Sequence, residues 1–207
     1  MPRPEVYSRS VFINCPFSID YQPIFRAIVF TVYACGFRPR CALEINDSSE
    51  NRLVKIENII AECGLGIHDI SFADIDAKTG LPRFNMPFET GIFFGAKRFG
   101  SGAQKRKVAL VLDKTAFRYR KSLSDISVQD VSSHNGNAKT AIRHVRDWLD
   151  TCQGGKYSLP GGDHIHSQYQ KFSRNLPAAS KQLKLTAAEL TYADVCRAIE
   201  VWLRDNS

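Results

Sequence analysis

The sequence predicts a doubly wound α/β fold with a mainly parallel sheet, followed by a C-terminal helical appendage. Short apolar runs recur along the first 150 residues, and such runs are typical of strands buried on both faces of a parallel sheet. Longer segments with apolar residues at helical spacing lie between them. Glycine and proline cluster after about residue 155, and only helical patterns follow.

The first half of the chain alternates strands and helices. Residues 11–15 are an apolar run that Pro16 ends, and we expect the central strand there. Asp20 stands where it can cap a helix that Gly36 ends. The same alternation then predicts a strand at 38–43, a helix at 53–63 and a strand at 66–70.

The second half continues the alternation and then becomes helical. We expect a helix at 86–98, a strand at 107–113, a short fifth strand near 126–131 and an amphipathic helix at 138–149. The composition shift divides the chain into an α/β domain at 8–153 and a helical C-terminal extension at 156–207. In that extension Thr191 and Asp194 have the spacing of a capping box.

Composition narrows the class of protein. The 207 residues are 43% hydrophobic and carry a formal net charge of +7, from 28 basic and 21 acidic residues. The densest basic stretches, 105–107 and 118–121, are not interleaved with stacking aromatics, so we do not expect nucleic-acid binding. No apolar run is long enough for a membrane helix and no secretory signal is visible, which favours a cytoplasmic protein.

Cysteine and histidine patterns predict no metal site. The six cysteines form no CxxC pair, and several lie in apolar runs, so we expect reduced, buried thiols. His164 and His166 have a metal-like spacing, but no nearby Cys or Glu completes a ligand set.

Polar residues gather where three predicted strands end. In an open parallel sheet, ligands bind beyond the carboxyl ends of the strands, at the point where strand order reverses. The three segments expected there are Asn14-Cys15-Pro16-Phe17-Ser18, then Asp69-Ile70-Ser71, then Asn85-Met86-Pro87-Phe88-Glu89-Thr90-Gly91. Their convergence predicts a ligand crevice at this edge.

Glu89 is the candidate catalytic residue, because it is a carboxylate among apolar neighbours at the start of a helix. Such a carboxylate can stabilise the positive charge that grows on a sugar when its N-glycosidic bond breaks, or form a covalent sugar ester. It can equally do no more than favour the helix N-terminus through the macrodipole. Spacing alone leaves these readings open.

The segment Asn85-Met86-Pro87-Phe88-Glu89-Thr90-Gly91 resembles the Asn-Val-x-Phe-Glu-x-Gly signature of bacterial Toll/interleukin-1 receptor (TIR)-like nucleotide-binding domains, relatives of the nucleoside 2-deoxyribosyltransferases. The strand before Pro16 and the strand ending at Asp69 resemble those families in order and spacing. The transferases usually place Asp-Gly-Thr before the glutamate, and this chain does not. The resemblance covers residues 10–150 and implies a TIR-like, flavodoxin-like sheet.

The same resemblance implies cleavage of NAD between ribose and nicotinamide, often in anti-phage defence, with Glu89 as the catalytic carboxylate. NAD would be the substrate, and no cofactor is implied. A non-catalytic nucleotide-binding sensor and a deoxyribosyltransferase-like enzyme are the alternatives. Self-association is implied as well, and the C-terminal helices offer a surface for it or for a protein partner.

The resemblance also implies which residues of the expected crevice bind the ligand. Asn14, Pro16, Phe17 and Ser18 would line the nucleotide pocket after the first strand. Asp69 and Ser71 would face the ribose, although a strand-end carboxylate can also bond the N–H groups of a neighbouring loop. Phe88 and Asn85 complete the set, and the position of Asn85 also suits a helix cap.

Overall fold

A parallel sheet forms the centre of the computed structural model, which describes residues 4–71, 80, 83–126, 129–182, 184–186 and 189–206. Its strands are β1 (Ser10–Asn14), β2 (Arg38–Arg40), β3 (Leu65–Asp69), β4 (Val108–Asp113) and β5 (Val131–Ser133). Their order is β2-β1-β3-β4-β5, and every neighbouring pair runs parallel. The predicted doubly wound α/β fold is therefore confirmed.

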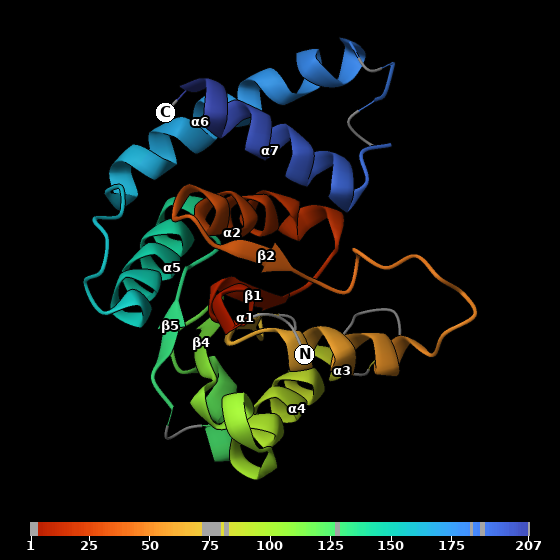
Figure 1. Cartoon of the computed structure of the whole chain (residues 1–207), viewed down its shortest axis with the longest axis vertical. Coiled ribbons are helices and arrows are strands. Elements are labelled where there is room, and N and C mark those ends of the chain that lie inside the picture. Colours follow the sequence, from red (N-terminus) through yellow and green to blue (C-terminus); the bar gives the residue numbers. More distant parts are fainter. Residues whose placement is uncertain are drawn as a thin grey trace.

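Helices cover both faces of the sheet (Figure 1). The helices α2 (Gln22–Ala34) and α5 (Ala138–Gln153) lie on one face, and α3 (Arg52–Glu62) and α4 (Asn85–Phe99) lie on the other. Side chains alternate along a strand, so Val11 and Ile13 of β1 enter the α2/α5 core while Phe12 enters the α3/α4 core. The short helices are α1 (Pro4–Arg9), η1 (Ile19–Tyr21), η2 (Gly102–Arg106), η3 (Arg118–Lys121) and η4 (Ser124–Ile126).

The C-terminal helices α6 (Gly162–Gln182) and α7 (Tyr192–Asn206) add a layer outside α2 (Figure 1). The Phe30 and Phe172 rings lie 5.5 Å apart, and the Tyr169 hydroxyl donates to the carbonyl of Pro23 at 2.6 Å. These helices share one apolar core with α2 and α5. The division of the chain at residue 155 stays a prediction.

Two of the predicted helix ends are confirmed, and a third is wrong. Gly36 adopts a φ of +76° after α2, and Thr191 and Asp194 bond each other's backbone N–H as a capping box before α7. The prediction that Asp20 caps α2 is wrong. Asp20 lies inside η1, and the N-cap position belongs to Tyr21, which makes no side-chain cap.

The fifth strand lies later than predicted. Residues 124–126 form η4, residues 127–128 lie outside the described residues, and the strand occupies Val131–Ser133. Ser132 and Ser133 are polar, so this strand has no alternation of apolar and polar residues. It is defined by its pairing with β4 and not by a hydrophobic pattern.

The helices and the cysteine thiols bear on two further predictions. Within the described ranges, no helix combines the length and apolarity needed to cross a bilayer. The cysteine thiols are free, and all but Cys152, which is half-buried, are buried. The predicted burial is confirmed for these thiols, and their reduced state stays a prediction.

Gly66→Ala is expected to destabilise the protein by about 2–3 kcal/mol. A Cβ at Gly66 would lie 2.7 Å from Nε2 of His68 and 2.8 Å from two ring carbons of Phe93, and both side chains are fully buried. Urea unfolding measures the change. Gly95→Ala, in α4 with no atom within 4 Å of the added Cβ, is the control and should stabilise by about 0.5–1 kcal/mol. Equal stability of the two variants would contradict the packing argument.

Candidate functional site

The candidate site lies at the carboxyl ends of the parallel strands. Strand β1 has β2 on one side and β3 on the other, so the strand order reverses between β1 and β3. Asn14, Asp69 and Asp113 are the last residues of β1, β3 and β4, and all three are buried. The fold therefore places three polar strand ends beside one another.

Asp69 is the centre of a hydrogen-bond network. The Tyr21 hydroxyl and Nε2 of His134, at 3.0 Å, both contact Oδ2 of Asp69, and the Ser71 backbone N–H donates to Oδ1 at 2.9 Å. Burial raises the pKa of the Asp69 carboxyl, but the interactions with His134, Ser71 and Tyr21 outweigh it, and the net pKa lies below the ordinary value. Asp69 thus ties together the loops that follow β1, β3 and β5.

His134, Ser71 and Asp69 do not form a hydrolytic triad. In such a triad the carboxylate bonds Nδ1 of the histidine while the serine bonds Nε2. Here Ser71 Oγ, at 3.1 Å, and Asp69 both approach Nε2, and Nδ1 accepts the backbone N–H of Gly136 at 3.0 Å. Since Nδ1 is an acceptor, the ring proton lies on Nε2 and is directed at Asp69. The arrangement holds loops together and does not activate Ser71.

A second chain of hydrogen bonds holds the start of α4. The Asn14 amide nitrogen donates to the carbonyl of Met86 at 2.8 Å and lies 3.4 Å from the Thr90 hydroxyl. The same nitrogen lies 3.3 Å from Nδ1 of His68. Burial, with a smaller contribution from Lys107, lowers the pKa of His68 to about 3, so its ring is neutral and Nδ1 can accept. Asn14 therefore joins β1 and β3 to the first turns of α4.

Glu89 lies in that anchored part of α4. It is 9% exposed, and no hydrogen bond or ion pair to it is found among the described residues. Burial raises the pKa of Glu89 to about 7, and the charge of Arg52 only partly opposes this effect. The carboxylate is thus withdrawn from water, and no described residue supplies a bonded cation.

Cys15 lies close enough to Asp69 and Glu89 for both charges to act on its thiol. This buried thiol follows β1, and its pKa is raised well above the ordinary value by burial and then by the nearby charges of Asp69 and, more weakly, Glu89. The thiol is therefore protonated and not a nucleophile at neutral pH. Because both charges act on the same thiol, Asp69 and Glu89 belong to the same edge of the sheet.

The predicted ligand residues have different surroundings. Pro16 is buried, and the half-buried Phe17 packs against Phe25 with ring centroids 5.3 Å apart, at the border of the α2/α5 core. Both Asp69 oxygens accept protein hydrogen bonds, so contact with a ribose would require this network to rearrange. The Ser18 hydroxyl is buried with no partner in the described part of the chain, whereas Phe88 is 57% exposed.

Asn85 does not cap the helix, so that prediction is wrong. Helix α4 begins at Asn85 itself, and the N-cap position belongs to Phe84. The helix thus starts one residue earlier than a cap at Asn85 requires, and the Asn85 side chain is exposed.

Sequence reasoning missed three residues of this edge. Tyr21 and His134 complete the Asp69 network, and Arg118 donates to Asp113 at 2.6 Å and to the carbonyl of Ile70 at 2.9 Å. His134 was obscured because the fifth strand was expected to end at residue 131. The strand ends at Ser133, so His134 lies directly at the carboxyl edge. A strand correctly placed at 131–133 would have pointed to His134.

Comparison of the chain with protein-family models, with curated proteins and with solved structures found no match.

Proposed function

We propose that this protein cleaves the N-glycosidic bond between ribose and nicotinamide in NAD, with Glu89 as the catalytic carboxylate. One observation carries the proposal: Glu89 is a buried carboxylate at the carboxyl edge of an open parallel sheet, and no cation bonded to it is found in the described part of the chain. Strongly perturbed carboxyls are candidates for catalysis, and ligands of open parallel sheets bind at the carboxyl edge. The resemblance of residues 85–91 to the TIR-like signature supports the same residue.

The chemistry needs a negative charge close to the sugar. When the bond from ribose C1′ to the nicotinamide nitrogen breaks, its electron pair leaves with nicotinamide, and positive charge spreads over C1′ and the ring oxygen. An ionised Glu89 would stabilise that charge, and its environment strengthens the effect because little water screens it. Water then adds to C1′ and loses a proton, giving ADP-ribose.

The anchored helix start supports this role. Catalytic stabilisation requires a carboxylate that is positioned before the reaction. The Asn14 amide holds the Met86 carbonyl and contacts Thr90, which lie on either side of Glu89 in α4. Glu89 is therefore carried by a part of the helix that is attached to β1.

The direct test is product analysis by chromatography after incubation of the purified protein with NAD. The expected products are nicotinamide and ADP-ribose, or nicotinamide and a cyclised ADP-ribose, and Glu89→Gln should form them far more slowly than the native protein. Calorimetry on the same samples separates the alternatives. NAD binding without product would favour a non-catalytic nucleotide-binding module, and neither binding nor product would contradict the proposal.

The rate of nicotinamide release is expected to rise with pH through about 7 and then level off. The pKa of Glu89 is about 7, and the ionised form is the one that stabilises the cationic sugar. A profile of kcat/KM between pH 5 and 9 measures this effect. A rate that falls over the same range would contradict the assignment of ionised Glu89 as the stabilising group.

A further inference from the structure

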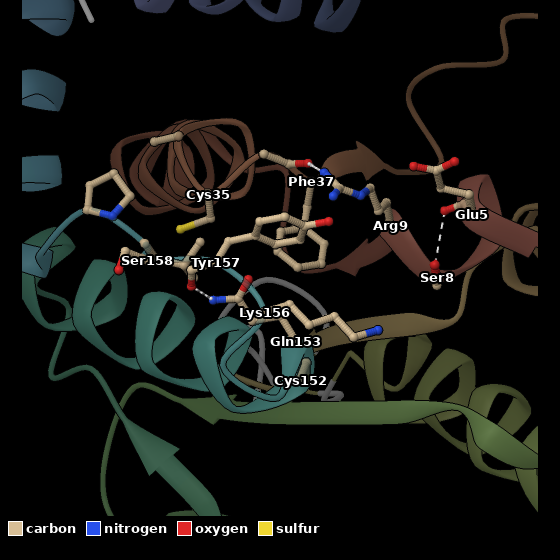
Figure 2. A pocket seen from close by; sticks show the side chains of 14 residues that line it. Glu5, Ser8, Arg9, Cys35, Phe37, Cys152, Gln153, Lys156, Tyr157 and Ser158 are labelled. Atoms are coloured by element: carbon tan, nitrogen blue, oxygen red, sulfur yellow. Dashed lines mark hydrogen bonds between the residues drawn. The ribbon is translucent and has the colours of Figure 1, made fainter.

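A second candidate ligand site lies at the opposite edge of the sheet. An open cavity of about 520 Å³ is bounded by α1, by the C-terminal ends of α2 and α5, and by residues 156–160 (Figure 2). Arg9 directly precedes β1, so the cavity lies at the amino ends of the strands and not at the edge that carries Glu89. Its volume is within the range of about 300–1,000 Å³ that is typical of small-molecule sites.

Two cations line this cavity. Lys156 is exposed, and no ion pair to it is found within the described ranges. The Arg9 guanidinium lies 5.3 Å from the centroid of the Tyr157 ring and makes no ion pair within those ranges. Glu5 is the acidic residue among the described lining residues, and in Figure 2 it lies at the α1 end of the cavity, with Arg9 between it and Tyr157. The local charge therefore favours an anion.

The C-terminal ends of α2 and α5 weaken the attraction of this cavity for an anion, but they do not cancel it. The C-termini of α2 and α5 carry partial negative charge. Arg9 donates to the carbonyl of Gly36 at 3.2 Å, just after α2. This bond uses one N–H of Arg9 and none of Lys156, so positive charge remains available to a ligand.

Apolar surface lies beside the cations. Tyr157 is 59% exposed although it is a large aromatic residue, and the half-buried Phe37 and Leu159 also line the cavity. In Figure 2 the Tyr157 ring lies between the side chains of Arg9 and Lys156. We propose that this cavity binds a small aromatic acid, whose anionic group meets Arg9 and Lys156 and whose ring lies against Tyr157 and Phe37.

The test uses two fluorescent probes of similar shape. 8-Anilinonaphthalene-1-sulfonate carries an anionic group, and N-phenyl-1-naphthylamine lacks it. The folded protein should bind the sulfonate saturably, with an affinity that falls in 0.5 M NaCl. Lys156→Gln should weaken sulfonate binding about three- to fivefold, and Arg9→Gln with Lys156→Gln about tenfold, while binding of the neutral probe stays unchanged.

The controls separate this site from the rest of the surface and from the Glu89 edge. Lys105→Gln removes an exposed cation elsewhere and should leave both probes unaffected. Lys156 makes no hydrogen bond among the described residues, so its variant should fold normally. Equal sulfonate affinity in the native protein and the double variant would overturn the proposal. Because Glu89→Gln leaves this cavity intact, the result does not depend on whether NAD is cleaved.

Discussion

Glu89→Gln is expected to lower the rate of nicotinamide release from NAD by about 10³-fold. Glutamine has nearly the same shape as glutamate but carries no charge, so the stabilisation of a cationic sugar is lost while the packing of α4 is kept. Stopped assays that quantify nicotinamide by chromatography can follow this range. Glu57→Gln, at an exposed position on α3, is the matched control and should release nicotinamide at the native rate.

The same substitution is expected to stabilise the fold at pH 8 by about 1–2 kcal/mol. The pKa of Glu89 is about 7 in the folded protein, above its ordinary value of 4.5, so the folded state binds more protons than the unfolded state between these values. Stability therefore falls as the pH rises through this window, because a charge must then be buried. Glutamine removes that cost.

Urea unfolding at pH 4 and pH 8 tests this prediction. The two proteins should differ little at pH 4, where Glu89 is protonated in both states, and the variant should be more stable at pH 8. An inactive variant with raised stability excludes unfolding as the reason for lost activity. A variant that is inactive and less stable at pH 8 would contradict the view that Glu89 is a buried charge without a bonded partner.

His134→Ala is expected to destabilise the protein by about 3–4 kcal/mol at neutral pH. The substitution removes the bond between Nε2 and Asp69, leaves a buried carboxylate with fewer donors, and frees the N–H of Gly136. The loops after β3 and β5 lose their direct connection. The measurement is the free energy of unfolding in urea, with His164→Ala, an exposed histidine of α6, as the control.

The pH dependence of the stability lost in His134→Ala identifies the cause of that loss. The pKa of Asp69 is below its ordinary value, so the folded state binds fewer protons than the unfolded state, and the network adds stability above about pH 4. That contribution disappears as the pH falls through the folded-state pKa. The difference between native protein and His134→Ala should therefore shrink below pH 4. A constant difference would indicate lost packing and not a lost interaction with the carboxylate.

Most of the fold could be predicted from local pattern. The strands β1, β3 and β4 lie within one residue of their expected limits because each is an apolar run with a clear end. The fifth strand was misplaced because Ser132 and Ser133 have no such pattern and depend on β4 for pairing. The position of α6 and α7 on α2 had a signal in the sequence: α2 is apolar almost all round, as a helix covered on two sides must be.

The candidate site could be predicted as a set of positions but not as an arrangement. Asn14, Asp69 and Glu89 were each identified from their place beside a strand end or helix start. Their partners lie far along the chain: Asn14 bonds a residue 72 positions away, Tyr21 reaches Asp69 across 48 positions, and Ser71 approaches His134 across 63. Local periodicity carries no information about such distances.

By itself the sequence determined the fold class, the order of the elements and the edge at which polar residues gather, since burial patterns and turns are local properties. Only the tertiary structure decided how the two acidic candidates differ. Asp69 is saturated by donors from three loops, and Glu89 is left buried without a hydrogen bond or ion pair in the described part of the chain. The difference arises because the pKa and availability of a carboxylate depend on the groups that folding brings around it.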